Sequence, residues 1–372
     1  MNTLIYFSLL TNILYGLLLY SYFLKWRQRK HLIEYDEFTL DKLPSLTIVV
    51  PFRNEENNLP NLLKSLKQIN YPKNKLEFIF VNDHSEDNSL AMLENNFSDF
   101  KLFSLSESFG KKAALDLGIR KANGEWIVTI DADVSFESDW LITLIQPSIN
   151  SDIVMICGLV RISYDDHKWW SKFQAMEFAV LQASGAAAIM QGRALLNSGA
   201  NLAFRKDIWL QLGAYNSHKH LASGDDTFLL FEMNKQYPGK VFSATNSIVT
   251  TSSEISFKKL IQQRLRWSGK TIHYKDSYVW MVGVIVVLSS FLTVINLISL
   301  PFFKSQCVIL TLIILSLRLI PEWLLLNTSL YDKKRNFRYY DKLLMTLFYP
   351  FFIVLLLSLQ PFNKISWKGR QL

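Results

Sequence analysis

Long apolar segments at the two ends of the 372-residue chain constrain its fold more than any other feature. Leu4 to Leu24 contains no charged residue and is long enough to cross a bilayer as a helix. Lys25, Arg27 and Arg29 follow it, whereas a signal peptide carries its positive charge before the apolar core. Because basic flanks mark the cytoplasmic side, we expect residues 1–25 to be an uncleaved N-terminal transmembrane anchor that leaves the following domain in the cytoplasm.

The last third of the chain is apolar again, and residues 278–360 are expected to form a transmembrane region of two or three spans. Tyr278 to Pro301 and Cys307 to Leu326 each have the length of a span. Leu343 to Leu359 is shorter and is interrupted by Pro350. If this segment crosses, alternate counting places the basic C-terminal tail outside, against the charge rule. Either the segment re-enters without crossing, or the tail is an exception.

Two ionisable residues fall inside the second of these spans. Arg318 and Glu322 are one helical turn apart, so they can pair within the membrane. Ionisable groups at membrane depth usually face protein or a water-filled cavity. The alternative is that both side chains snorkel toward an interface.

The composition of the chain favours some classes of binding partner over others. The chain is 49% hydrophobic, its mean hydropathy is +0.12 and its net charge is +8. The basic residues cluster beside the apolar segments, which favours an anionic lipid surface over nucleic acid. Cys157 and Cys307 are the only cysteines, so no disulfide framework is expected. We expect an integral membrane protein of a bacterial inner membrane that binds no nucleic acid.

Residues 42–253 have the pattern of an α/β domain. Runs rich in β-branched residues alternate with segments of helical spacing such as 55–67 and 111–121. The expected strands are 46–50, 76–81, 101–105, 126–130 and 153–156. This alternation predicts a mostly parallel sheet flanked by helices.

Polar clusters follow three of the expected strands. Arg53 and Glu55 come after the first strand, Asp83 after the second, and Asp131 and Asp133 after the fourth. Parallel strands end at one edge of the sheet, where α/β proteins bind ligands. Two carboxylates at i and i+2 suit a hard divalent cation that keeps other positions for water and phosphate. We therefore expect a metal–diphosphate site, although an ordinary acidic turn would explain any single cluster.

Six short motifs occur in an order that resembles one known family. They are Val50-Pro-Phe-Arg-Asn-Glu-Glu, Val81-Asn-Asp-His-Ser-Glu-Asp, Gly110-Lys-Lys-Ala-Ala-Leu, Asp131-Ala-Asp, Gly224-Asp-Asp and Gln263-Arg-Leu-Arg-Trp. From about Ser45 to Ser268 the chain resembles the membrane-anchored family 2 glycosyltransferases, which have a GT-A fold and include cellulose and hyaluronan synthases and ceramide glucosyltransferase. Each motif is weak alone, whereas the ordered set ending in Q-x-x-R-W is specific.

The resemblance implies a role for each matching residue. Asp83 would hydrogen-bond the uracil ring of a UDP-sugar, and Lys111 would lie near the diphosphate or support the loop. Asp131 would contact the nucleotide-sugar, and Asp133, with Asp131 beside it, would bind Mg²⁺ or Mn²⁺. The remaining donor-binding residues would be Pro51, Arg53 and Glu55 at the nucleotide, and Gln263, Arg266 and Trp267, which would close the site.

The resemblance also implies that Asp226 is the general base. The family commonly has Glu-Asp here, so the pair Asp225-Asp226 leaves open which carboxylate takes the proton. Asn82 and His84 stand where the family commonly has Asp and Gly. The retained Asp83 should keep base recognition, and His84 is expected to be a surface loop residue.

These residue types fit the chemistry of sugar transfer. A metal and a cation such as Arg266 can neutralise the charge that develops on a leaving diphosphate. A carboxylate opposite the leaving group can take the proton from an attacking hydroxyl. One base without a second protein nucleophile implies a single displacement with inversion.

The region around Q-x-x-R-W bears on the acceptor. Residues 254–275 mix apolar side chains with Lys258 and Lys259, which predicts an amphipathic helix in the membrane interface. The alternative is a surface helix packed on the soluble domain. Tyr164 to Gln182 is a second candidate interfacial helix. The Gly- and Ala-rich run 184–199 either lets an acceptor approach the backbone or allows tight packing.

We therefore expect an inverting, metal-dependent glycosyltransferase that moves a sugar from UDP to a membrane-embedded lipid at the cytoplasmic face. The alternative is a processive polysaccharide synthase, because Q-x-x-R-W is frequent there too. A third hypothesis is an inactive membrane scaffold, but the retained acidic residues argue against it. The expected partners are a UDP-sugar donor, a lipid or glycan acceptor and membrane lipids, and the few spans leave room for a homo-oligomer or a partner subunit.

Overall fold

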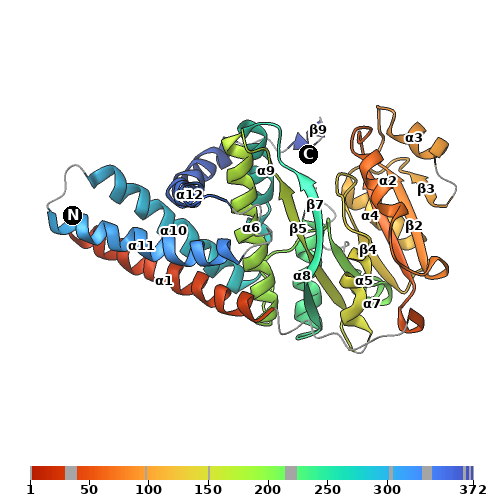
Figure 1. The fold of residues 1–372 in the computed structure, drawn as a ribbon, viewed down its shortest axis with the longest axis horizontal. Coiled ribbons are helices and arrows are strands. Elements are labelled where there is room, and N and C mark those ends of the chain that lie inside the picture. Colours follow the sequence, from red (N-terminus) through yellow and green to blue (C-terminus); the bar gives the residue numbers. More distant parts are fainter. Residues whose placement is uncertain are drawn as a thin grey trace. The chain divides into compact units, whose positions relative to one another are not determined.

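The chain folds into two compact units, each assembled from several stretches of sequence (Figure 1). The computed structural model describes residues 2–29, 40–96, 99–149, 151–213, 224–300, 305–328, 337–362, 366–367 and 370–371. The helical unit comprises Met1–Leu32, Tyr164–Gln191 and Ser253–Ile365. The sheet unit comprises Ile33–Ser163, Gly192–Ser252 and Ser366–Leu372.

A seven-stranded sheet forms the core of the sheet unit. Its strand order is β3-β2-β1-β4-β6-β5-β7. The strands are β1 (Leu46–Phe52), β2 (Leu76–Asn82), β3 (Lys101–Ser104), β4 (Trp126–Thr129), β5 (Met155–Ser163), β6 (Leu202–Arg205) and β7 (Val241–Ser252). β1 to β4 are mutually parallel, and β5 is parallel to β7, whereas β6 runs antiparallel to both of its neighbours. The prediction of a mostly parallel sheet flanked by helices is confirmed.

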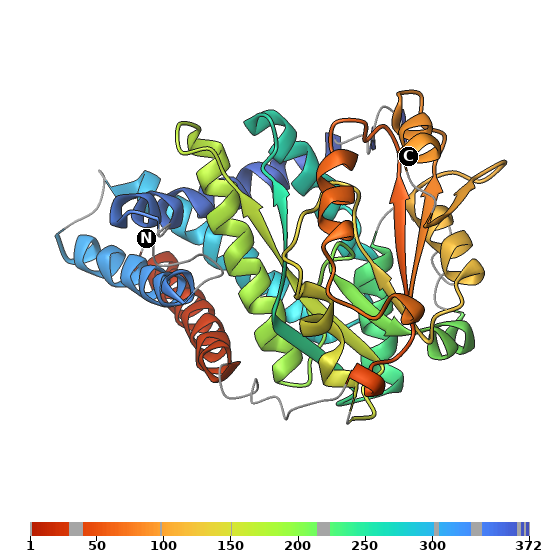
Figure 2. The same cartoon turned by 45° about the vertical axis from the view of Figure 1, so that its right-hand side comes forward.

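Helices connect the strands of this unit. They are α2 (Leu59–Lys67), α3 (Ser89–Asn96), α4 (Lys111–Lys121), α5 (Trp140–Ile145), α7 (Lys206–Leu212) and α8 (Asp225–Gln236). α4 lies against β1 and β2 (Figures 1 and 2). Its approach is close at Gly118, where a Cβ atom would lie 2.5 Å from Val49 Cγ1 and 3.1 Å from Val81 Cγ2. The missing side chain at Gly118 therefore allows the helix to pack on the sheet.

The first strand is longer than the predicted range 46–50. β1 continues to Phe52, and Pro51 is paired in register with Val81 of β2. On the other side, β4 ends opposite Val49. Pro51 therefore lies where β1 has a strand neighbour on one side only, and proline is tolerated at such edge positions.

The helix predicted over 55–67 begins later than expected, at Leu59. The backbone N–H groups of Glu55 and Glu56 donate instead to Ser89 Oγ (2.7 Å) and Asp87 Oδ2 (3.0 Å). The next helix, α3, begins at Ser89. The segment before α2 is therefore hydrogen-bonded to the segment that leads into α3, where the sequence pattern predicted a further helical turn.

After β4, the sequence pattern predicted fewer of the strands and helices of the sheet unit. The strand expected at 153–156 begins at Met155 and continues to Ser163. The pattern did not predict β6, β7, α7 or α8. β6 has four residues, and its place between β4 and β5 depends on antiparallel pairing with segments far away in the sequence.

Six helices of more than ten residues make up the described part of the helical unit. They are α1 (Asn2–Gln28), α6 (Trp169–Met190), α9 (Phe257–Ser268), α10 (Ser277–Ser299), α11 (Ser305–Asn327) and α12 (Tyr339–Leu359). α1, α10, α11 and α12 are long and apolar enough to cross a membrane. α12 continues through Pro350. The basic tail residues Lys364 and Lys368, which entered the prediction of the last span, lie outside the described residues.

Arg318 and Glu322 pair inside the helical unit. Their side chains are buried, with Arg318 Nη2 lying 3.8 Å from Glu322 Oε1. Tyr15 donates a hydrogen bond of 2.6 Å to Glu322 Oε1, and Arg318 Nη1 donates to Ser289 Oγ at 3.1 Å. The snorkelling alternative is therefore wrong, since both side chains are held by groups on α1, α10 and α11.

Candidate active site

The carboxyl ends of β1, β2 and β4 present the predicted polar clusters at one edge of the sheet. The three strands are parallel and adjacent, with Phe52 opposite Asn82 and Val49 opposite Thr129. β6 runs in the other direction, so the start of β6 adjoins the end of β4. The residues before β6 therefore reach the same edge, which the sequence pattern did not indicate.

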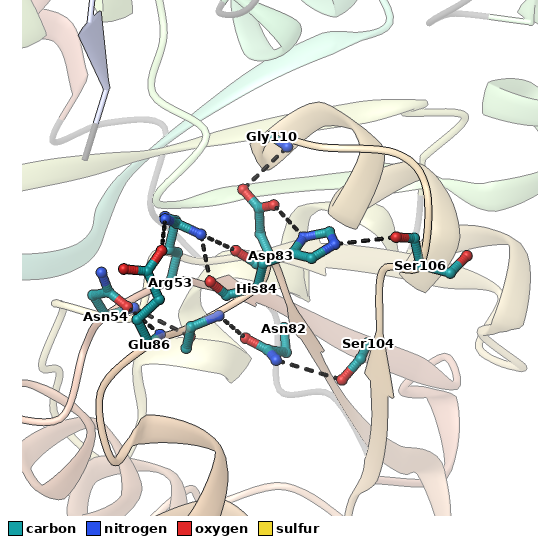
Figure 3. Close-up of polar contacts among 10 residues, drawn as sticks. Arg53, Asn54, Asn82, Asp83, His84, Glu86, Ser104, Ser106 and Gly110 are labelled. Atoms are coloured by element: carbon teal, nitrogen blue, oxygen red, sulfur yellow. Dashed lines mark hydrogen bonds and ion pairs between the residues drawn. The ribbon is translucent and has the colours of Figure 1, made fainter. Parts of the chain in front are cut away.

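Arg53 connects the loops that follow β1 and β2 (Figure 3). It is 4% exposed, and its Nη1 donates to the carbonyl oxygens of Asp83 (2.9 Å) and His84. Its Nη2 donates to Glu86 Oε1 at 2.7 Å. The guanidinium thus holds the backbone that directly follows the Asp83 side chain, the group expected to bind a nucleobase.

The Asp83 carboxylate is 1% exposed and is held by two neighbours (Figure 3). Its Oδ2 accepts from the N–H of Gly110 at 3.0 Å, and its Oδ1 lies 3.2 Å from Nδ1 of His84. Gly110 directly precedes α4. Asp83 therefore joins the end of β2 to the start of the helix that carries Lys111.

His84 lies in the loop after β2, as expected, where it is partly exposed and packs against Asp83. Its φ is +54°, in the left-handed region that favours glycine, which is the residue common in the resembling family. The ring stacks on Phe109 with centroids 4.4 Å apart, and Nε2 lies 3.2 Å from the carbonyl oxygen of Ser106. These contacts stabilise a conformation that otherwise costs free energy.

The Lys111 ammonium group interacts both with Asp131, a carboxylate of the predicted metal motif, and with Asp226, the predicted base. Its Nζ lies 2.5 Å from Asp131 Oδ1. Burial lowers the pKa of Lys111, but the charges of Asp131, Asp225 and Asp226 outweigh that effect and raise it. One ammonium group at the start of α4 is therefore surrounded by carboxylates from the end of β4 and the start of α8.

Gly199, three residues before the start of β6, completes this arrangement. Its N–H donates to Asp226 Oδ2 at 2.9 Å, and its carbonyl oxygen accepts from Thr129 Oγ1 at 2.8 Å. A Cβ atom on Gly199 would lie 3.3 Å from Asp226 Cβ and 3.7 Å from Lys111 Nζ. The Gly- and Ala-rich run thus provides tight packing at this position, and Gly199 is a site residue that the motif analysis missed.

The two candidate bases differ in their surroundings. α8 begins at Asp225, directly after Gly224, whose φ is +93°. Asp225 is buried, whereas Asp226 is half-buried and also accepts from the N–H of Thr227 through Oδ1 at 2.7 Å. Two backbone N–H groups therefore orient the Asp226 carboxylate, which keeps access to solvent.

Asp133 lies beside two further carboxylates. Thr251 of β7 donates to its Oδ2 at 2.9 Å. Although the Asp133 side chain is partly exposed, desolvation of its carboxyl group, reinforced by the negative charges of Asp131 and Glu55, raises its pKa to about 6. The repulsion among these acidic groups is the kind that a bound cation relieves.

The donor set fits a divalent cation that shares its coordination with a ligand. Among the residues that the structure describes, no three His, Cys, Asp or Glu side chains are placed to form a complete protein site. Mg²⁺ and Mn²⁺ accept one or two carboxylates and take their other ligands from phosphate and water. Asp131 and Asp133 provide such a pair of hard oxygen ligands.

The residues of Q-x-x-R-W lie on α9 in the helical unit. α9 is shorter than the predicted 254–275 helix, because it ends at Ser268 and a 3-10 turn follows over Thr271–His273. Gln263, Arg266 and Trp267 are half-buried. Their expected closing of the donor site stays a prediction.

The chain matches a known domain over part of its length. Residues 47–212 match the family described as Glycosyl transferase family 2. A solved structure, the mannosyltransferase PcManGT from Pyrobaculum calidifontis in complex with GDP-Man and Mn2+, has the same fold with a TM-score of 0.64 and 15% identity. That similarity covers 97% of this chain and 99% of the other.

Three relatives illustrate the range of activities in similar proteins. The probable glycosyltransferase YdaM of Bacillus subtilis is 26% identical over 72% of this chain and 66% of its own length. The undecaprenyl-phosphate 4-deoxy-4-formamido-L-arabinose transferase of Proteus mirabilis is 35% identical over 26% of this chain and 31% of its own length. The poly-beta-1,6-N-acetyl-D-glucosamine synthase of Staphylococcus aureus is 30% identical over 32% and 29%, respectively. The matches thus span less than two thirds of each of these relatives.

Proposed function

We propose that this chain, which contains a glycosyl transferase family 2 domain with a GT-A fold, is an inverting, metal-dependent enzyme that transfers a sugar from a UDP-sugar to a lipid acceptor in the membrane. The observation that carries the proposal is the convergence of Lys111, Asp131, Asp133 and Asp226 at one sheet edge. This edge joins a cation site, a fixed positive charge and a candidate base, which are the groups that the transfer requires.

The donor end of the site neutralises a diphosphate. Asp131 and Asp133 would hold Mg²⁺ or Mn²⁺, which supplies positive charge where the leaving diphosphate gains negative charge. Lys111 lies beside Asp131 and adds an ammonium group at the same edge. Asp83 would accept a hydrogen bond from an N–H group of the nucleobase once its present neighbours, Gly110 and His84, rearrange. An acceptor at this position suits uracil.

The acceptor end removes a proton. Asp226 takes the proton from the attacking hydroxyl as the oxygen bonds to the anomeric carbon and the bond to the diphosphate breaks. Gly199 and Thr227 keep the Asp226 carboxylate oriented. A single displacement inverts the configuration, so an α-linked donor yields a β-glycoside.

A lipid acceptor agrees with the apolar helices and with the relative that acts on undecaprenyl phosphate. The test incubates membranes containing the protein with radiolabelled UDP-glucose, UDP-galactose, UDP-N-acetylglucosamine and GDP-mannose in turn, followed by extraction with organic solvent. Label should enter the organic phase, as a lipid that carries one sugar, from a UDP-sugar.

Each of the other outcomes contradicts a different part of the proposal: the lipid acceptor, the UDP donor or the catalytic activity. A product that lengthens with time and resists delipidation would establish a processive polysaccharide synthase, the activity of the Staphylococcus relative. Transfer from GDP-mannose alone would refute the UDP donor and retain the reaction type. Nucleotide binding without transfer from any donor would favour the inactive scaffold.

Metal dependence has its own test. EDTA should abolish transfer until excess Mn²⁺ or Mg²⁺ is restored, and Asp133→Ala should be inactive under both conditions. Full activity of the purified protein in excess chelator would refute a metal-assisted mechanism.

A further inference from the structure

Beside the motif arginine Arg266, the Q-x-x-R-W segment contains a second arginine, Arg264, to which the sequence assigned no role. The structure separates them, because Arg264 points into the helical unit and is 4% exposed, whereas Arg266 is half-buried. Burying a guanidinium is costly unless its charge is paired and its N–H groups are hydrogen-bonded. The partners of Arg264 therefore indicate what its burial achieves.

Glu177 of α6 pairs with Arg264 through both carboxylate oxygens. Arg264 Nε donates to Oε1 at 3.0 Å, and Nη2 donates to Oε2 at 2.5 Å. Both side chains are 5% exposed. This two-point geometry fixes the plane of the guanidinium as well as its position.

Trp267 lies against the guanidinium that Glu177 holds. The Arg264 Cζ atom is 4.2 Å from the centroid of the Trp267 ring, and the two residues are i and i+3 on α9. On the α6 side, Phe178 lies 5.8 Å from the same ring, measured between centroids. The indole is therefore oriented by a cation whose own orientation is set by Glu177.

Gln263 belongs to the same hydrogen-bond network. Its Oε1 accepts from Arg264 Nη1, and its Nε2 donates to Glu254 Oε1 at 2.7 Å. The N–H of Glu254 in turn donates to Oε1 of Gln174 on α6 at 2.8 Å. The first and last residues of Q-x-x-R-W are thus held against α6 through Arg264 and its partners.

We propose that Glu177 and Arg264 are positioning residues for sugar transfer, and that their ion pair sets the orientation in which Trp267 and Gln263 meet the ligand. This inference rests on the proposed function, because it assigns to α6 the alignment of a motif that acts in transfer. Arg266 then remains the arginine of the motif that meets the diphosphate.

Glu177→Gln tests the proposal, because it retains the shape of the side chain and removes its charge. We expect turnover to fall about 10²-fold, the effect of a small misplacement of a reacting group, while the Kd for the donor nucleotide is unchanged. Glu322→Gln is the matched control, because Glu322 forms the other buried ion pair with an arginine among the described helices of this unit. Its folded protein should turn over as the wild type does.

A double-mutant cycle with Trp267→Ala distinguishes positioning from general loss of structure. If Glu177 acts through Trp267 and Gln263, adding Glu177→Gln to Trp267→Ala should lower turnover much less than Glu177→Gln does in the wild type. Independent effects that multiply would overturn the proposal. So would an equal loss of turnover in Glu177→Gln and in Glu322→Gln.

A second variant covers the case in which Glu177→Gln does not fold, because an uncompensated buried charge is strongly destabilising. Glu177→Leu combined with Arg264→Met removes both charges and should yield folded protein whose turnover is still about 10²-fold low. Full turnover in this variant would overturn the proposal. A wild-type protein that transfers no sugar fails the proposed function itself, and this inference falls with it.

Discussion

Two adjacent carboxylates at the start of α8 pose the main residue-scale question. Asp226 is oriented by the N–H groups of Gly199 and Thr227, and it keeps access to solvent. Asp226→Asn should therefore keep donor binding and lower turnover by about 10²–10⁴, the usual contribution of a general base. Asp225→Asn should have a milder effect. Turnover and nucleotide Kd measured for both variants decide the assignment, and an inactive Asp225→Asn beside an active Asp226→Asn would exchange the two roles.

Asp133 links catalysis to the stability of the metal-free protein. Its pKa in the folded chain is raised to about 6 by desolvation of the carboxyl group and by the charges of Asp131 and Glu55, although part of the side chain is exposed. A raised carboxyl pKa means that the folded state disfavours the charged form. Stability from this group is therefore lost as the pH rises from the unfolded pKa, about 3.8, through the folded pKa of about 6, and it changes no further at higher pH. Asp133→Asn should accordingly raise the thermal unfolding midpoint of metal-free protein at pH 7 while abolishing transfer.

The control for Asp133→Asn is the same comparison of unfolding midpoints at low pH. Toward pH 4 the wild-type Asp133 is protonated in the folded state, so the difference in unfolding midpoint between the two proteins should disappear. Thermal unfolding measured at several pH values in EDTA tests this. An Asn variant that is less stable than the wild type at pH 7 would show that the repulsion is not felt in the folded chain.

At the scale of elements, the packing of α4 on β1 and β2 positions Lys111. Gly118→Ala would bring a methyl group to 2.5 Å from Val49 Cγ1, so α4 or the sheet must shift. Overpacking of this kind typically costs about 1–3 kcal/mol of unfolding free energy. We expect a lower unfolding midpoint and reduced turnover, because α4 carries Lys111 at its first position.

Gly283 of α10 is the matched control for this helix substitution. A Cβ atom there meets nothing within 4 Å. Gly283→Ala should be neutral or slightly stabilising, since alanine is the better helix former. If the two alanine variants unfolded at the same temperature, close packing at Gly118 would not be the reason for its glycine.

At the scale of the whole molecule, the C-terminal tail bears on the number of membrane crossings. β8 (Ser366–Trp367) and β9 (Arg370–Gln371) pair antiparallel and belong to the sheet unit. A tail within that unit shares its side of the membrane, so three crossings by α10, α11 and α12 would place it on the wrong side. We therefore predict that α12, which contains Pro350, does not cross.

Cysteine labelling tests this topology. In a variant lacking Cys157 and Cys307, Ser366→Cys should react with a membrane-impermeant thiol reagent from the same side as Lys64→Cys, an exposed position of α2. Lys304→Cys, between two candidate spans in the sequence, should react from the opposite side. Labelling of Ser366→Cys and Lys304→Cys from one side would show that α12 crosses.

Local patterns were enough to predict the apolar spans, the parallel part of the sheet and the placement of Asp83, Asp131 and Asp133 at one sheet edge. Each follows from patterns a few residues long, because hydrophobic runs define spans and strands, and parallel strands end at one edge. The same local information predicted α4 with its bounds at Lys111 and Lys121.

Contacts between side chains that are far apart in the sequence became visible in the fold. The N–H of Gly199, in the segment before antiparallel β6, donates to Asp226, Thr251 reaches Asp133 across 118 positions, and Arg264 reaches Glu177 across 87. Such contacts leave no periodic signal, because each depends on how separate elements pack. The motif residues can be identified from the sequence, whereas the neighbours that orient them are brought into contact by the packing of β6, β7 and α6.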